Sequence, residues 1–124
     1  MKPISRTLIA LGLAQMLLVA PVHAQAQAPL ELALQVVGEL AQVNGQALAC
    51  QELKIAARAK SLMIAHAPKT ARFGEAYEVG TQHSYSAQVN GAAACPDSTA
   101  LTKRLDALAQ RLHTALPIPL PESK

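Results

Sequence analysis

The sequence has no tryptophan, and its only aromatic residues are Phe73, Tyr77 and Tyr85. Because β-branched and aromatic residues favour strands, their scarcity argues against a sheet. Alanine and leucine dominate instead, so a core must be built from many small contacts. The composition predicts an all-α protein, and about a hundred residues beyond the N-terminal segment suffice for one domain with one modest core.

A run long enough to span a bilayer is also missing. The longest apolar stretch, TLIALGLAQMLLVA at residues 7–20, is shorter than the roughly 20 residues that a spanning helix needs. It follows the basic segment MKPISR and precedes PVHAQAQA, which carries small residues where a signal peptidase cuts. We therefore predict a signal peptide at residues 1–24, cleaved after Ala24, with Ala26 and Ala28 as alternative sites. The protein is then periplasmic or secreted, without a stable membrane anchor after cleavage, and an uncleaved anchor is the alternative.

An excess of one charge is absent once this segment is removed. The net charge of +3 includes Lys2 and Arg6, and nine Lys/Arg against eight Asp/Glu remain. A chain so nearly balanced has no basic face for nucleic acid or anionic lipid. We expect no nucleic-acid partner.

Only two cysteines are present, Cys50 and Cys95. Catalytic thiol pairs are usually close in sequence, as in C-x-x-C, and these two are not. In an exported chain such a pair predicts a structural disulfide, which adds about 4 kcal/mol in the chain-entropy model.

Apolar periodicity predicts four helices in a domain at residues 25–116, followed by a Pro-rich flexible tail at 117–124. The helices are Leu30–Val43, Leu48–His66, about Lys69–Val89, and one that starts at Asp97 or Ser98 and ends before Pro117. In the fourth helix Leu101, Leu105, Leu108 and Leu112 form a single stripe.

The pentapeptide AQVNG occurs twice, at residues 41–45 and 87–91, and a cysteine follows each copy. Asn-Gly tolerates the left-handed backbone of a helix C-terminus, so we expect each copy to end a helix. The chain would then be two helical hairpins with the disulfide between equivalent corners. Outside AQVNG and the cysteines the two halves do not align, so a true duplication stays open.

No motif for catalysis or cofactor binding is present. The sequence lacks G-x-S-x-G, H-E-x-x-H, Walker and dinucleotide patterns. His66, His83 and His113 fall on different predicted helices, and none has a second ligand at i+3 or i+4, so no metal site is predicted, although a site assembled across helices stays open. We expect no enzyme activity, no catalytic residue and no cofactor.

The first two helices carry more apolar surface than one seam of a small bundle requires. Either both helices are central in the bundle, or their spare faces meet a protein partner, a second copy or an apolar ligand. The candidate partner-binding residues are Leu32, Val36 and Val43 on the first helix and Leu48, Ile55 and Leu62 on the second.

The segment ACQEL at Ala49–Leu53 resembles the first cysteine segment of the small periplasmic acid-stress chaperones. That family is exported, helical, near this size and held by one long-range disulfide. The present chain differs because a whole helix precedes its first cysteine and an aromatic-rich middle is missing. The resemblance implies no functional residues here.

The sequence is compatible with three functions. The first is a non-enzymatic exported module that binds another protein or itself. The second is a periplasmic holdase chaperone activated by acid, because neutralised carboxylates would leave nine Lys/Arg and three histidines to repel one another. The third is a carrier of a metal or small ligand.

Overall fold

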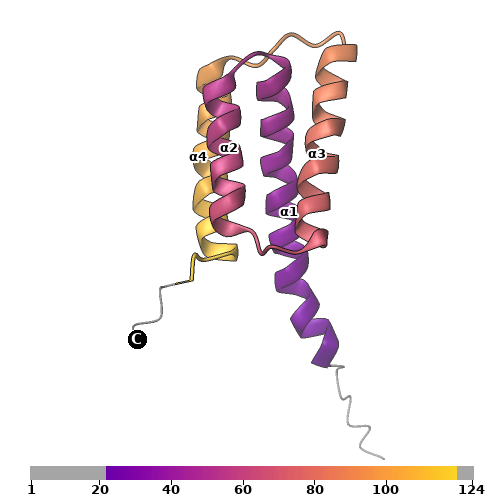
Figure 1. The fold of residues 1–124 in the computed structure, drawn as a ribbon, viewed down its shortest axis with the longest axis vertical. Helices are drawn as coiled ribbons and strands as arrows, with labels where there is room; N and C mark the ends of the chain where they lie inside the picture. The colour runs from indigo at the N-terminus through magenta and orange to yellow at the C-terminus, as the bar shows by residue number, and fades with distance from the viewer. Residues whose placement is uncertain (1–21, 120–124) are drawn as a thin grey trace, which may run out of the picture.

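The computed structural model describes residues 22–119, with the side chains of residues 22–26 left out. Within this range it has four helices and no strand: α1 (Val22–Ala49), α2 (Leu53–His66), α3 (Ala71–Asn90) and α4 (Ser98–Ala115) (Figure 1). The predicted all-α fold is confirmed. The predicted signal peptide falls almost wholly outside the described residues, as do residues 120–124 of the predicted tail. Across residues 22–119, the helices are too short or too polar to cross a membrane.

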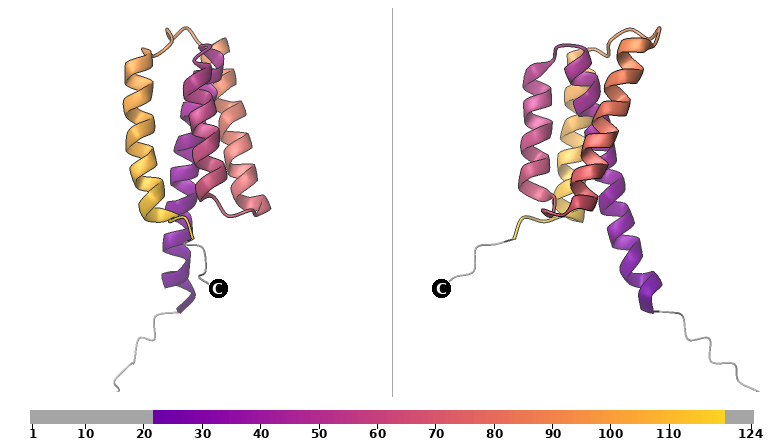
Figure 2. Two further views of the ribbon diagram at one scale, coloured as in Figure 1. Left: turned by 60° about the vertical axis from the view of Figure 1, so that its left-hand side comes forward. Right: turned by 45° about the vertical axis from the view of Figure 1, so that its right-hand side comes forward.

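Helix α1 is the central element of the bundle. It packs against all three other helices, most extensively against α3, and its N-terminal turns project beyond them (Figures 1 and 2). Helices α1 and α2 form the first predicted hairpin. Helices α3 and α4 have almost no direct contact, because each covers a different side of α1, so the second predicted pair is not a packed hairpin.

The core combines α1 with the leucine stripe of α4. All four leucines of that stripe are buried, as their spacing predicts, and α4 packs on both α1 and α2. Burying one such side chain contributes about 1.5–3 kcal/mol. Helix α3 adds one large buried side chain, Phe73, so its contact with α1 depends mainly on small residues. The largest fully buried side chains are Val36, Val37, Leu40, Val43, Leu101, Leu105 and Leu112.

The first AQVNG copy does not end a helix, so that prediction is wrong. Helix α1 continues through it to Ala49, and no glycine in the described chain has a positive φ. Gly45 instead lies against α3, where an added Cβ would come 2.4 Å from the Thr81 carbonyl oxygen. Asn44 Nδ2 donates to Thr81 Oγ1 at 3.1 Å, and Ser84 Oγ donates to the Gln42 carbonyl at 2.7 Å. At this segment α1 and α3 approach too closely to leave room for a side chain at position 45.

The end of α1 comes at Gln51, whose φ is +61°. The Glu52 N–H donates to the Ala47 carbonyl at 2.8 Å, and the Gln51 N–H donates to the Leu48 carbonyl at 3.2 Å. These two bonds are the Schellman arrangement, with Gln51 in the position that usually holds glycine. Leu48 consequently belongs to α1, and the second helix begins at Leu53 rather than at Leu48.

The second AQVNG copy does end a helix, as predicted. Helix α3 ends at Asn90, and the Gly91 N–H donates to the Ala87 carbonyl at 2.9 Å. Gly91 has a φ of −84°, so the left-handed conformation that the motif suggests is not used. Asp97 then caps α4, since its carboxylate accepts from the Thr99 N–H at 2.6 Å.

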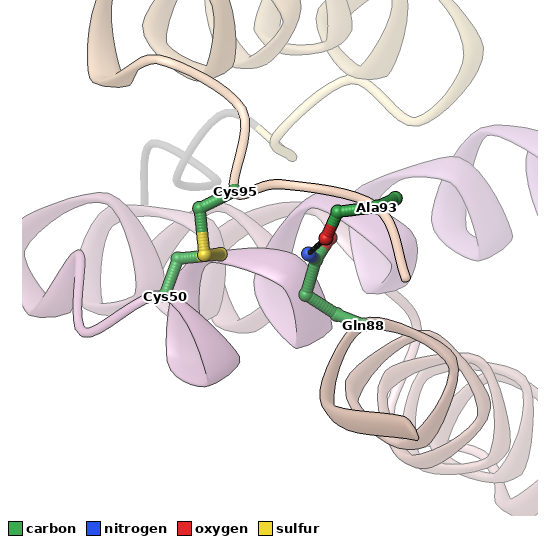
Figure 3. The surroundings of a disulfide bond; sticks show 4 residues. All are labelled: Cys50, Gln88, Ala93 and Cys95. Carbon is green, nitrogen blue, oxygen red and sulfur yellow. Dashed lines mark hydrogen bonds between the residues drawn. A yellow bond between two sulfur atoms is a disulfide. The ribbon is translucent and has the colours of Figure 1, made fainter. Parts of the chain in front are cut away.

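The predicted disulfide joins Cys50 and Cys95, whose Cα atoms are 5.8 Å apart (Figure 3). It connects the end of α1 to the segment that leads from α3 to α4. Gln88 Nε2 donates to the Ala93 carbonyl at 3.0 Å and holds the same segment to α3. The disulfide and this hydrogen bond hold the segment between α3 and α4 in place, because those two helices have almost no direct contact with each other.

Candidate functional site: the groove between α2 and α3

Helices α2 and α3 lie on α1 without packing closely on each other, and a groove runs between them. It consists of two depressions, of about 330 Å³ and about 400 Å³. Lys60 of α2 and Tyr77 of α3 line both, so the two depressions are adjacent. The end near the α1–α2 turn also includes Asn44 and Leu48 of α1.

The groove is largely apolar and its large side chains are exposed. Leu48 is 40% exposed, Leu53 65% and Ile64 57%. Leu48 and Leu53 line one of the two adjacent depressions, and Ile64 lines the other. The remaining apolar lining residues are Ala56, Ala57, Met63, Ala67 and Pro68.

Tyr77 lies where the two depressions meet. Its hydroxyl is buried and has no hydrogen-bond partner in the described chain. Burial raises the pKa of Tyr77 to about 12, because the phenolate would lose its hydration. A buried hydroxyl without a partner costs about 1–3 kcal/mol, so this position is suboptimal in the isolated protein.

Charges border the groove unequally. Lys60 and Lys69 lie on the α2 side and Glu78 on the α3 side. Lys69 Nζ is engaged, since it donates to the Ile64 carbonyl at 2.6 Å near the end of α2. The rim is therefore more basic along α2 than along α3.

The structure places the six predicted partner-binding residues in different environments. Val36, Val43 and Ile55 are in the core, with exposures of 1%, 0% and 9%, and Leu62 is partly buried against it. Leu48 lines the groove, and Leu32 is 50% exposed on the opposite part of α1. Only Leu32 and Leu48 are thus open to a partner in the folded protein.

The apolar pattern of α2 includes residues that line the groove. Two apolar faces are visible in its sequence, and the structure turns the Ile55 and Ala59 face into the core. The other face, with Leu53 and Ile64, borders the groove. Periodicity separates the two faces but does not say which of them the rest of the bundle covers. Tyr77 shares one predicted face of the third helix with Phe73 and Ala76, so the pattern predicts that it packs inward but not that it borders a groove.

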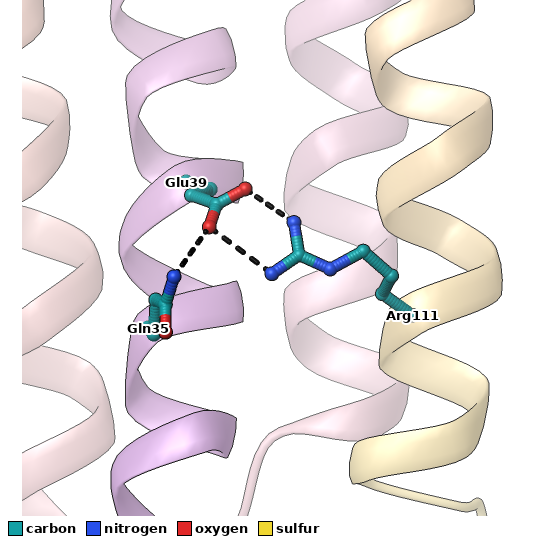
Figure 4. Close-up of polar contacts among 3 residues, drawn as sticks. All are labelled: Gln35, Glu39 and Arg111. Carbon is teal, nitrogen blue, oxygen red and sulfur yellow. Dashed lines mark hydrogen bonds and ion pairs between the residues drawn. The ribbon is translucent and has the colours of Figure 1, made fainter.

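A smaller depression of about 250 Å³ contains Leu32 and lies between α1 and α4. Arg111 borders it and forms a two-pronged ion pair with Glu39, which also accepts from Gln35 Nε2 at 3.2 Å (Figure 4). The hydrogen bonds from Arg111 lower the pKa of Glu39, and partial burial opposes them. This pair ties α1 to α4.

Two further ion pairs also connect different helices. Arg58 of α2 lies 2.6 Å from Asp106 of α4, and Arg72 of α3 lies 3.0 Å from Glu31 of α1. All the ion pairs found in residues 22–119 therefore join one helix to another. Each is at least a third exposed, so each contributes at most about 1 kcal/mol.

No protein-family model matches this sequence, and neither a curated protein nor a solved structure is significantly similar to it.

Proposed function

We propose that this chain is a small exported module that binds a helix of a partner protein in the groove between α2 and α3. The observation that carries the proposal is the pair of adjacent, largely apolar depressions between α2 and α3, which the exposed side chains of Leu48, Leu53 and Ile64 line. Exposed apolar side chains that gather along a depression favour an interaction site. The disulfide and the basic–apolar–small order of the N-terminal segment support export to the periplasm or beyond.

The shape of the groove favours a helical occupant. Helix α2 has 14 residues, so the groove beside it is about 21 Å long, which matches four turns of a docked helix. Amphipathic helices bind such grooves through residues at i, i+3, i+4 and i+7. Because the α2 rim carries Lys60 and Lys69, the expected partner helix has acidic residues beside its apolar stripe.

The test is photo-crosslinking from single positions in cells that export the protein. A photoreactive residue at Leu53 or Ile64 should give the same defined adduct. The same residue at Val79 or Val89, which are 61% and 56% exposed but outside the groove, should give none. An adduct of twice the chain's mass would identify a second copy as the partner. No adduct, or equal adducts from all four positions, would contradict the proposal.

Matched substitutions complete the experiment. Leu53→Glu should abolish the adduct formed from position 64, and Ile64→Glu should abolish the adduct formed from position 53. Both substitutions should leave helicity unchanged, because both side chains are exposed. The same substitution is unsuitable at Val36 and Ile55, two of the predicted partner-binding residues, because an unpaired carboxylate buried in the core would unfold the protein.

The arrangement of the ion pairs favours a second function, an acid-activated holdase. All three described pairs join helices, so protonating their carboxylates loosens the contacts of α1 and α2 with α3 and α4 at once. Near- and far-UV circular dichroism from pH 7 to pH 2 tests it. Loss of the near-UV signal around pH 3 with helicity partly kept, and suppression of client aggregation only in acid, are expected. An unchanged spectrum would refute it.

A further inference from the structure

Two histidines that the sequence gives no reason to connect lie together at one end of the bundle. His66 is the last residue of α2, and His113 lies in the last turn of α4. Their ring centroids are 6.3 Å apart, with the ring planes at 88°. The pair arises because α2 and α4 run in the same direction and pack on each other, which brings their C-terminal ends together (Figure 1).

The hydrogen bond of His66 fixes its tautomer. Its Nδ1 lies 2.7 Å from the carbonyl oxygen of Leu116, the residue that follows α4. A carbonyl can only accept, so Nδ1 carries the proton and Nε2 of the neutral ring keeps its lone pair. Imidazoles that bind metals in proteins are held in this way, with the second ring nitrogen donating to a carbonyl or carboxylate.

We propose that His66 and His113 together bind one divalent transition-metal ion. Metal–nitrogen bonds of about 2.0–2.1 Å require two imidazole centroids on one ion to lie within about 6.5 Å of each other. The observed separation is just inside this limit, which applies when the two nitrogens lie on opposite sides of the ion, and a bent site requires the exposed His113 side chain to rotate toward His66. The ends of α2 and α4 also carry the negative ends of two helix dipoles, which favour a cation there.

The residues present define which ions fit. Within residues 22–119 no third His, Cys, Asp or Glu completes a cluster, so water fills the remaining coordination positions. Two imidazoles suit Cu²⁺, Ni²⁺ and Zn²⁺ rather than Mg²⁺ or Ca²⁺, and Cu²⁺ binds such a site most tightly. Lys69, on the carbonyl of Ile64, adds a positive charge to this end of the bundle and lowers the affinity. This site is separate from the groove and does not depend on the proposed partner.

The test is titration of the oxidised full-length chain with Cu²⁺ by calorimetry, with circular dichroism to confirm folding. One ion should bind per chain, and electron paramagnetic resonance should show two nitrogen ligands. His113→Ala and His66→Ala should each weaken binding about tenfold or more, as loss of a metal-site interaction does. His83→Ala is the matched control and should leave binding unchanged.

Thermal unfolding distinguishes a variant that has lost the metal site from one that has lost the fold. His113 is exposed, so His113→Ala should keep the thermal midpoint of the metal-free protein. Added Zn²⁺ should raise the midpoint of the wild type and of His83→Ala, because the ion connects α2 to α4, but not that of His113→Ala. Absence of binding, or equal loss in all three single variants, would overturn the proposal.

Discussion

Two glycines of α1, Gly38 and Gly45, should respond in opposite directions to the same substitution. Alanine in place of glycine in a helix interior is worth about 0.5–1 kcal/mol of stability. At Gly38 an added Cβ meets nothing within 4 Å, so Gly38→Ala should gain that amount. At Gly45 the new Cβ would come 2.4 Å from the Thr81 carbonyl oxygen and 2.7 Å from the Tyr85 nitrogen.

These are backbone atoms, so α1 and α3 must move apart by about 1 Å to reach ordinary van der Waals contact. Overpacking of this kind costs about 1–3 kcal/mol. The movement also strains the bonds from Ser84 to Gln42 and from Asn44 to Thr81, each worth about 1 kcal/mol. After the gain in helix propensity, Gly45→Ala should lose about 2–4 kcal/mol.

Urea unfolding of the oxidised protein, followed by circular dichroism at 222 nm, measures both variants. The difference between them should be at least about 2.5 kcal/mol, or about 10 °C or more in thermal midpoint for a domain of this size. If Gly45→Ala proved as stable as Gly38→Ala, the close approach of α1 and α3 would be wrong, and with it the explanation for α1 continuing through Asn44.

Three further predictions concern single side chains. Gln51→Gly should raise the free energy of unfolding by about 1 kcal/mol in a urea titration, since φ of +61° disfavours residues with a Cβ; no gain would argue against that turn. Tyr77→Phe should be neutral or stabilising at pH 7 and should reduce the stability lost between pH 10 and pH 12, where Tyr77 with its raised pKa stays neutral in the folded state while the unfolded chain ionises; a large loss at pH 7 would show that the hydroxyl has a partner. Glu39→Gln should cost about 0.5–1 kcal/mol at pH 7, and because the folded-state pKa of Glu39 is lowered, this difference should vanish as pH falls below the ordinary value of 4.5; an identical pH profile for the two proteins would mean that the pair with Arg111 contributes nothing.

The sequence alone determined the class of the fold and most of its helices. The apolar stripe, the Asp97 cap and the prolines at 68 and 117 located α3, α4 and the end of α2 to within a few residues, because they act through neighbours in sequence. The start of α2 was missed, because the turn at Gln51 was not recognised. The disulfide followed from counting cysteines. The helices depend on residues that are close in sequence, and the disulfide has one possible pairing because the chain has two cysteines.

Tertiary structure decided what the two identical pentapeptides do. Asn44–Gly45 has α3 beside it, and the contact with Thr81 is worth more than a left-handed turn at that point. Asn90–Gly91 has no such neighbour and ends its helix, as its sequence suggests. The sequence of AQVNG contains no information about which helix will lie against it.

The candidate sites depend on the same kind of information. Periodicity showed that α2 has two apolar faces, but only packing determined that Ile55 faces the core and Leu53 the groove. His66 and His113 are separated in sequence by all of α3 and most of α4, and they meet because α2 and α4 lie side by side in the same direction. Local sequence fixes where a side chain lies around its own helix axis, whereas the packing of the other helices decides what it meets.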